Sequence, residues 1–241
     1  MKYLFMLLLG IATGVLMVVG FLLYSPMSPE GISPLSVSER PQFSLSYSAV
    51  VDDAIAYTNN GESPIATNPD KIAMLWEAPL QKTVVLVTAL RDGRGSMAGI
   101  GIKFSSRSEE TRLLQGEALV NSVWHVVLPD QGTLLVAQAE NHWNYLREVV
   151  IPAYWSSADN WKGSWHGTLS SGPGALGTGD VHGGSGRFRD YDAEAIETLT
   201  ARAYSTETGP VAVDGQLIIE QPVPASELSA DVTLKLRTSS D

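Results

Sequence analysis

Much of this chain alternates apolar and polar residues with a period of two, the pattern of β-strands with one buried face. The first such segment places Phe43, Leu45, Tyr47 and Ala49 on one side and serines on the other. Further strands are predicted over 83–90, 98–104 (where Ala98, Ile100, Ile102 and Phe104 alternate), 118–128, 133–137, 162–170, 193–205 and 211–220. About eight strands at this spacing predict a mainly β protein, a closed antiparallel barrel or a sandwich.

Two short segments have helical signals instead. The residues Asn68-Pro69-Asp70 form a helix start before KIAMLWEA, and 141–151 has an apolar helical face that Pro152 is expected to end. The segment 154–161 then reads as an irregular loop. Two features near the C-terminus complete the expectations: a bulge or hairpin at Asp214-Gly215, and an edge strand over 231–237.

The first 24 residues predict a membrane anchor. Residues 4–23 form an uncharged run of 20, long enough as a helix to cross the bilayer's hydrocarbon core. No convincing cleavage site follows the run, which favours an uncleaved signal anchor. Lys2 precedes it and the next cation is Arg40, so the N-terminus is expected in the cytoplasm. In a bacterium, the main domain would then be periplasmic, on a single-pass inner-membrane protein.

Three parts of the chain follow from this pattern: an anchor over 1–24, a Pro- and Ser-rich linker over 25–41, and a β-barrel-like domain over 42–241. The linker is expected to be extended and semi-rigid. Within the anchor, Gly10 and Gly14 form a G-x-x-x-G pattern that lets a second membrane helix approach closely. The alternative is that small residues are simply common in membrane helices.

Composition excludes several function classes. The net charge of −10 and the lack of a basic cluster argue against a nucleic-acid partner. The chain contains no cysteine, which excludes disulfides, thiolate metal sites and thiol nucleophiles. Its acidic pairs and its histidines have no metal-ligand spacing, and no catalytic or cofactor motif is present. The sequence therefore predicts no catalytic residue, cofactor or metal, and favours a non-enzymatic role.

Glycines crowd one part of the chain, with nine in residues 163–187. Gly172 to Gly177 matches G-x-G-x-x-G, but the residues after it cannot open the helix that a dinucleotide turn requires. Glycine instead allows the sharp coiling and close backbone approach that small barrels need. This favours a barrel over a sandwich.

The glycine-rich stretch GTGDVHGGSGRFRDYDAEAIE (177–197) resembles the late hairpin of the allene oxide cyclase/dirigent-like barrel group, with Gly183, Gly184, Ser185, Gly186 and Phe188 carrying the match. WHGTLSSG upstream resembles the preceding strand, so the resemblance covers about residues 161–220. It implies an eight-stranded antiparallel barrel with an apolar interior. The group includes cyclases and stereochemical guides, but no catalytic residue of the group can be placed on this chain.

Aromatic residues and histidines supply the candidate contacts. Five of the six tryptophans lie in 124–165, and the four histidines are His125, His142, His166 and His182. Most of these tryptophans are expected in the core, and the histidines next to them in sequence are expected at the surface. Tyr154, Trp155 and Trp161 in the expected loop and His182 in the glycine turn are the candidate partner or ligand contacts.

Two functions remain in competition. The leading hypothesis is an accessory subunit, without enzymatic activity, of a respiratory or photosynthetic membrane complex, docking on other subunits through its periplasmic domain. The alternative is a tethered barrel that binds or isomerises a small hydrophobic ligand such as a lipid, carotenoid or quinone. A packed barrel interior favours the first, whereas an open apolar cavity of several hundred Å³ with convergent polar groups favours the second.

Overall fold

The computed structural model describes residues 2–24, 41–50, 53 and 83–221, and the fold within these ranges is mainly β. The strands are β1 (Gln42–Ser48), β2 (Thr83–Arg91), β3 (Met97–Arg107), β4 (Leu119–Leu128), β5 (Gly132–Asn141), β6 (Asn160–Thr168), β7 (Ser170–Gly172), β8 (Gly179–Gly186), β9 (Asp192–Ser205) and β10 (Gly209–Glu220). The predicted segments 68–78 and 231–237 and most of the linker lie outside the described residues.

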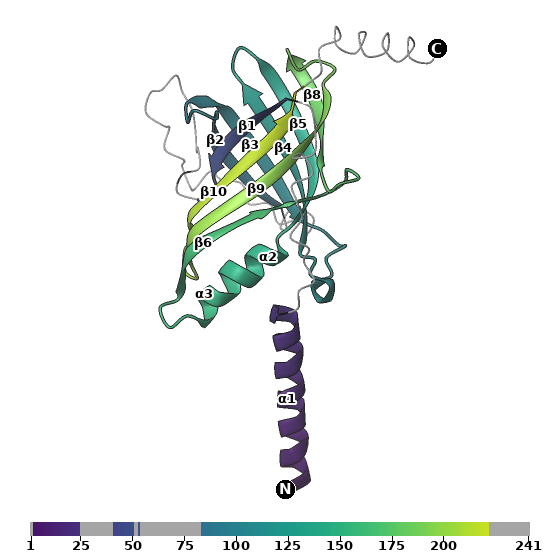
Figure 1. Ribbon diagram of the computed structural model, residues 1–241, viewed down its shortest axis with the longest axis vertical. Helices are drawn as coiled ribbons and strands as arrows, with labels where there is room; N and C mark the ends of the chain where they lie inside the picture. Colours follow the sequence, from purple (N-terminus) through teal and green to yellow (C-terminus); the bar gives the residue numbers. More distant parts are fainter. Residues whose placement is uncertain (1, 25–40, 51–52, 54–82, 222–241) are drawn as a thin grey trace, which may run out of the picture.

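Eight of the described strands close into an antiparallel ring in the order β10-β1-β2-β3-β4-β5-β8-β9, and β9 pairs back to β10 (Figure 1). This confirms the predicted antiparallel β-barrel class. The ring departs from a regular barrel at one place. β9 pairs with β8 through residues 192–195 and then with β6 through 198–205, so β6 takes over where β8 stops. The short β7 pairs with the end of β5.

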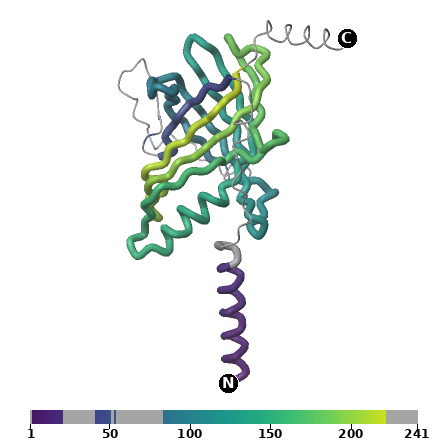
Figure 2. Tube along the Cα trace, in the orientation of Figure 1, coloured from purple at the N-terminus to yellow at the C-terminus, as the bar shows by residue number. Residues whose placement is uncertain are grey.

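A helical segment runs beside β6 across one end of the ring (Figure 2). It comprises α2 (Trp143–Tyr145), the π-helical turn η5 (Leu146–Val150) and α3 (Ile151–Trp155). The sequence predicted that Pro152 ends this helical segment, but the segment continues past it to Trp155. The π turn resets the register, and Pro152 falls in the first turn of α3, where its missing N–H removes no needed bond. Trp155 is therefore helical, and the expected loop 154–161 shrinks to the residues between α3 and β6.

Two apolar clusters fill the fold. The larger one packs the ring interior and is centred on Trp124, Val126, Leu134 and Phe188. The smaller one lies between the helical segment and β6, β9 and β10; its buried members are Tyr145, Val149, Trp165, Leu169, Leu199, Ala201 and Val213. The interior is thus packed at one end and lined by the helical segment at the other.

The apolar face of β3 points opposite to the simple expectation. Ile100 and Ile102 are half-buried and Phe104 is 45% exposed, whereas Lys103 is buried and points inward. The physical reason lies on β4: a Cβ at Gly101 would lie 2.7 Å from the Trp124 ring, so glycine leaves room for the indole. The alternation at 98–104 therefore identified the strand but not its inner face.

Glycine serves close packing at two points of the ring. A Cβ at Gly183 would lie 1.6 Å from the carbonyl oxygen of Phe188, consistent with the close backbone approach predicted for the glycine-rich stretch. The Asp214-Gly215 pair makes neither the predicted bulge nor a hairpin, because pairing continues through it and the register shifts fall at 210–213. Gly215 instead accommodates the Tyr47 ring, which a Cβ there would meet at 2.0 Å.

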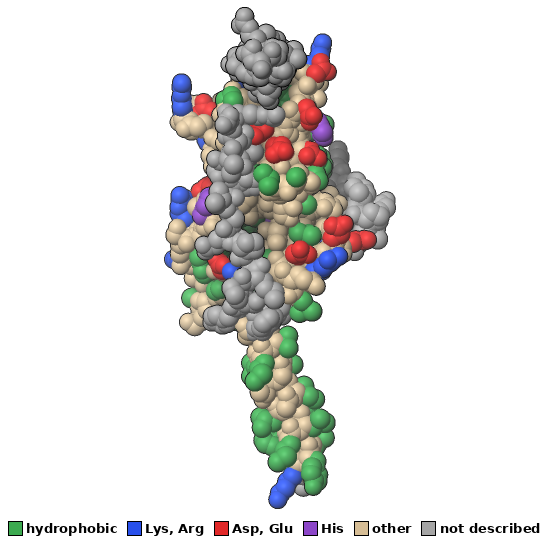
Figure 3. Space-filling model, turned by 45° about the vertical axis from the view of Figure 1, so that its right-hand side comes forward, with side chains coloured by type: hydrophobic (Ala, Val, Ile, Leu, Met, Phe, Trp, Pro, Cys, Tyr) green, Lys and Arg blue, Asp and Glu red, His purple; other side chains and the backbone are tan. Residues whose placement is uncertain are grey.

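At the N-terminus, α1 (Lys2–Tyr24) is a single helix, and hydrophobic side chains lie along its stretch Lys2–Gly20 (Figure 3). Its stretch Lys2–Gly20 has a mean hydropathy of 2.3 over 19 residues and is long and apolar enough to cross a membrane. It is the one such helix among the described residues. Gly10 and Gly14 lie on this helix, with open space beside each.

Candidate functional site

The ring interior changes from apolar to polar along β3, β4 and β5. Neighbouring positions in register carry Gly101, Val126 and Leu134 in one row and Lys103, Trp124 and Val136 in the next. The rows that follow carry Ser105, Ser122 and Gln138, and then Arg107, Val120 and Glu140. Because alternate residues of a strand share a face, these side chains all belong to the inner surface. A buried polar cluster therefore begins where the apolar core ends.

Glu197 of β9 is at the inner end of this cluster and is completely buried. Its Oε1 accepts hydrogen bonds from Lys103 Nζ at 2.7 Å and from the Tyr47 hydroxyl. Its Oε2 accepts one from Trp124 Nε1 at 2.9 Å and another from Gln138 Nε2. Four donors thus compensate the lost hydration of this carboxylate. Burial, and next the charge of Glu197, raise the pKa of Tyr47 well above its usual value, so the phenol remains a donor.

Glu140 of β5 is the second buried carboxylate, and it links two cationic groups. Its Oε1 lies 2.8 Å from Lys103 Nζ and also accepts a hydrogen bond from Ser122. Its Oε2 lies 2.8 Å from Nε2 of His142. Burial alone would lower the pKa of Lys103, but the charges of Glu197 and Glu140 outweigh burial and raise it, so the ammonium stays charged. One lysine therefore serves two buried carboxylates.

The charge state of Glu140 gives a pH-dependent contribution to stability. Burial alone would raise the pKa of Glu140, but the Lys103 charge and the His142 hydrogen bond lower it from 4.5 to about 2. A carboxyl whose pKa is lower in the folded state contributes stability above its unfolded pKa and loses it as pH falls through the folded pKa.

We therefore expect the free energy of unfolding to fall between pH 4.5 and about pH 2, and Glu140→Gln to make this fall smaller. Urea denaturation followed by circular dichroism across that interval measures it. Glu207→Gln, which removes an exposed carboxylate, is the matched control. Equal pH slopes for the wild type and Glu140→Gln would contradict the assigned charge of Glu140.

A cavity of about 760 Å³ adjoins this cluster. Its described lining residues are mainly apolar and come chiefly from β2 to β5, the helical segment, β9 and the start of β10; they include Val84, Ala118, Leu119, Val120, Leu146, Val150 and Pro210. Lys103, Glu140 and His142 lie on the same wall. The arrangement is an apolar hollow with a few converging polar groups, which is the usual form of a small-molecule site.

Local structure at the end of β5 positions His142 in this wall. The Asn141 side chain accepts hydrogen bonds from the backbone N–H groups of Ala118 and Trp143, and donates one to the Gly116 carbonyl at 3.0 Å. These bonds connect the turn before β4 to the start of α2. Tyr145, one helical turn after His142, also lines the cavity, and burial raises its pKa. Its hydroxyl has no hydrogen-bond partner among the described residues.

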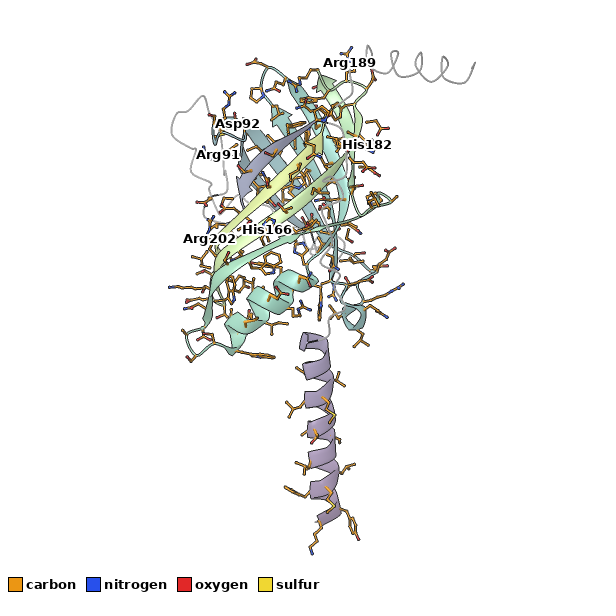
Figure 4. All side chains as sticks on the ribbon, in the orientation of Figure 1. Arg91, Asp92, His166, His182, Arg189 and Arg202 are labelled. Atoms are coloured by element: carbon orange, nitrogen blue, oxygen red, sulfur yellow. The ribbon has the colours of Figure 1, made fainter. Side chains whose placement is uncertain are left out.

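The residues predicted as contacts do not line this cavity. Tyr154 and Trp155 are 61% and 66% exposed at the end of α3, and Trp161 packs against the smaller apolar cluster. His182 lies on β8 at the outside of the ring (Figure 4), with Nδ1 4.0 Å from a carboxylate oxygen of Asp192. These four stay predicted partner or ligand contacts. The described residues contain no group of three or more His, Asp or Glu side chains able to hold a metal ion.

The polar cluster was missed by sequence reasoning, although a signal for it exists. In β5, Gln138 and Glu140 follow Leu134 and Val136 at alternate positions, so all four side chains lie on the inner face of the strand. Polar residues that continue the apolar face of a strand are buried polar groups, and buried carboxylates need partners. The partners Lys103 and Glu197 could not be found from spacing, because they lie on other strands.

Comparisons with known proteins give no family: no protein-family description and no curated protein matches the chain. Among solved structures, one match is described as a nonspecific haem-binding cyclase that catalyses 4 + 2 cycloaddition during neoabyssomicin biosynthesis. It is 11% identical, with a TM-score of 0.32, and the match covers 83% of this chain and 79% of that one. Another is the Diels-Alderase AbmU from Streptomyces koyangensis, 12% identical with the same TM-score, covering 83% and 81%.

The predicted role as a non-enzymatic accessory subunit of a membrane complex is wrong. Within the described residues, the ring interior is not fully packed, whereas the accessory role would require a packed interior. It has the open apolar cavity with converging polar groups that distinguishes a ligand site from a packed docking module.

Proposed function

We propose that this chain is a tethered barrel that binds a small, mainly apolar molecule in its interior cavity. The observation that carries the proposal is the convergence of Lys103, Glu140 and His142 on one wall of an otherwise apolar hollow. A volume of about 760 Å³ falls within the range of sites for small organic ligands. The hydrocarbon part of such a ligand would contact Leu146 and Val150, and its polar end would meet the charged wall.

The charged wall supports function because stability alone does not require it. Replacing a buried ion pair by apolar residues of similar size is often neutral or stabilising. The rows nearer the core already use Leu134 and Val126 at equivalent inward positions. Buried, mutually perturbed charges beside a cavity are typical of binding and catalytic sites.

A second hollow is a weaker candidate. It holds about 390 Å³ and is lined by residues of β2 to β5 and by Pro173. Its described lining includes Phe104, Val123 and Ala137 and contains no charged side chain. Its polar lining consists of neutral side chains such as Asn121, Ser122 and Gln138, and its volume is smaller than that of the interior cavity. The ligand site is therefore assigned to the interior.

The proposal predicts that Leu146→Trp blocks ligand binding, because an indole in place of Leu146 fills part of the cavity. The probe is the neutral dye N-phenyl-1-naphthylamine, titrated by fluorescence against the full chain in lipid nanodiscs. We expect saturable binding to the wild type and a dissociation constant at least about ten-fold higher for Leu146→Trp.

Leu176→Trp, at a residue that is 67% exposed in the turn before β8, is the matched control and is expected to bind like the wild type. Fluorescence from dye dissolved in the lipid is the same for both variants, so it cancels when their titrations are compared. Identical titrations of Leu146→Trp and the wild type would refute the interior site.

We also propose that α1 anchors the chain in a bacterial inner membrane, with a cytoplasmic N-terminus and a periplasmic barrel. The charge asymmetry of the sequence supports this orientation, since Lys2 precedes the apolar run and no cation follows before Arg40. Removing residues 2–24 is expected to move the protein from the membrane fraction to the soluble fraction. Protease added outside spheroplasts should degrade the barrel domain of the full chain; protection of that domain would reverse the orientation.

The allene oxide cyclase/dirigent-like resemblance stays a prediction. The ring of eight antiparallel strands has the strand number that the resemblance implies. An apolar interior that holds a ligand also agrees with it. Among the ligands considered from sequence, lipids, carotenoids and quinones, a cavity of this volume suits a molecule of a few hundred daltons or one end of a longer one.

A further inference from the structure

The geometry points to proton-transfer chemistry in this cavity, with His142 as the general base, Glu140 as its positioning residue, and a neutral apolar ligand with an acidic C–H bond as substrate. This inference rests on the proposed ligand site and deepens it. It assigns a reaction class to the site and a separate role to each of the two residues.

Glu140 determines which nitrogen of His142 is available. The carboxylate is ionised and can only accept, so the Nε2 atom 2.8 Å away carries the proton and donates it. The other nitrogen, Nδ1, then presents its lone pair. Nδ1 has no hydrogen-bond partner among the described residues, and the side chain is 26% exposed and lines the cavity. An imidazole held by a carboxylate on one side and free on the other is suited to take a proton.

The carboxylate is itself held firmly. Ser122, Lys103 and Gln138 all donate to its Oε1, with the Lys103 and Gln138 bonds at 2.8 and 3.1 Å. Its Oε2 is therefore directed at His142 alone. The backbone N–H of His142 bonds the Ala118 carbonyl at 2.9 Å, which anchors the residue at the helix start. A general base needs this kind of support, because even a small error in its position slows the reaction.

Charged groups from several elements surround His142. The titratable and charged residues lining the cavity with it are Lys103, Arg107, Glu140, Tyr145 and Tyr204, and Glu197 lies behind Lys103. The buried cluster carries +1 from Lys103 and −2 from Glu140 and Glu197, and Arg107 adds +1 in the cavity lining, so these four charges sum to zero. The charged groups together therefore select neither an anion nor a cation, and the rest of the lining is mainly apolar. The substrate we assign is therefore neutral.

Lys103 supplies the complementary charge for the substrate. Glu140 binds the ammonium through one oxygen and the imidazole through the other, so base and cation lie on the same wall. In the step we assign, Nδ1 takes a proton from a carbon next to a carbonyl group. The C–H electron pair forms a C=C bond, and the carbonyl π pair moves to oxygen, near the positive charge. In a carbonyl compound with a C=C bond between its β and γ carbons, the imidazolium returns the proton to the γ carbon. The oxygen pair re-forms the carbonyl, the new C=C bond shifts to the α and β carbons, and the former β–γ π pair binds the proton, so the reaction is an isomerisation without an oxidant.

A generic probe tests the base without knowledge of the natural substrate. In 5-nitrobenzisoxazole, a base removes the ring C–H proton, the electron pair completes a nitrile, and the N–O bond breaks to release a coloured phenolate. We expect the full chain in nanodiscs to catalyse this with saturation. We expect His142→Gln, which can still hydrogen-bond Glu140 but cannot act as a base, to lose about 100-fold.

His166→Gln is the matched control, since His166 is exposed and bonds Thr200 (Figure 4); it should keep wild-type activity. Leu146→Trp should abolish saturation. The wild-type rate, after subtraction of buffer catalysis, should rise with pH through one ionisation, and this holds even if His142→Gln does not fold. A flat profile, or folded His142→Gln with wild-type turnover, would overturn the inference.

The two proposals fail in different ways. Saturable dye binding without turnover of 5-nitrobenzisoxazole would support the ligand site but refute the assignment of His142 as a base. If the naphthylamine dye did not bind, the proposed ligand site itself would be refuted.

Discussion

Lys103→Met is expected to destabilise the folded protein by about 3–5 kcal/mol, the range for breaking a buried ion pair on one side only. Lys103 Nζ lies 2.7 Å from Glu197 and 2.8 Å from Glu140, and both carboxylates are almost completely buried. Methionine matches the volume but leaves two carboxylates facing each other without a cation. Urea denaturation at neutral pH, followed by circular dichroism, measures the change.

The triple variant Lys103→Met, Glu140→Gln and Glu197→Gln separates charge from packing. It removes the cation and both anions together and should recover most of the lost stability. Lys162→Met, at an exposed position of β6, should change stability by no more than about 0.5 kcal/mol. A folded Lys103→Met as stable as the wild type would mean that the cluster is not charged as described.

Trp124→Ala is the second large effect, with an expected loss of about 3–5 kcal/mol. Trp124 is fully buried, and its ring packs edge-on against Tyr47 with centroids 4.8 Å apart. Alanine would leave a void at the centre of the larger apolar cluster. It would also remove the Nε1–H donor that lies 2.9 Å from Glu197.

Trp124→Phe divides this loss between packing and hydrogen bonding. Phenylalanine keeps most of the apolar volume but cannot donate to Glu197, so it should lose about 1–3 kcal/mol. Trp155→Ala, at a residue 66% exposed, should lie within about 0.5 kcal/mol of the wild type. If Trp124→Phe and Trp124→Ala were equally destabilised, the hydrogen bond to Glu197 rather than the volume would dominate.

The strands were predictable because local patterns specify them. Thr83–Arg91 and Gly132–Asn141 have β-branched or alternating residues, and the turns before Gly132 and after Arg91 carry Gly and Asp. The inner face of β3 was not predictable in the same way. It depends on a neighbour, Trp124, which occupies the space that inward isoleucines would need.

The site lay beyond local patterns for a related reason. Lys103, Glu140 and Glu197 lie on β3, β5 and β9, and only closure of the ring brings the Lys103 ammonium within 2.8 Å of both carboxylates. Pro152 likewise read as a helix end, because the π turn before it has no sequence signature. Sequence motifs describe chemistry at fixed spacing along one segment, whereas this cluster is assembled across strands.

Photolabelling tests the interior ligand site most directly. The full chain in nanodiscs is irradiated with the small neutral probe 3-trifluoromethyl-3-phenyldiazirine, and the adducts are mapped by mass spectrometry. We predict saturable labelling of the peptides that contain Ala118–Val120 and Tyr145–Val150, absent in Leu146→Trp and retained in Leu176→Trp. Labelling confined to α1 and the outer faces of the strands, unchanged by Leu146→Trp, would contradict an interior ligand site.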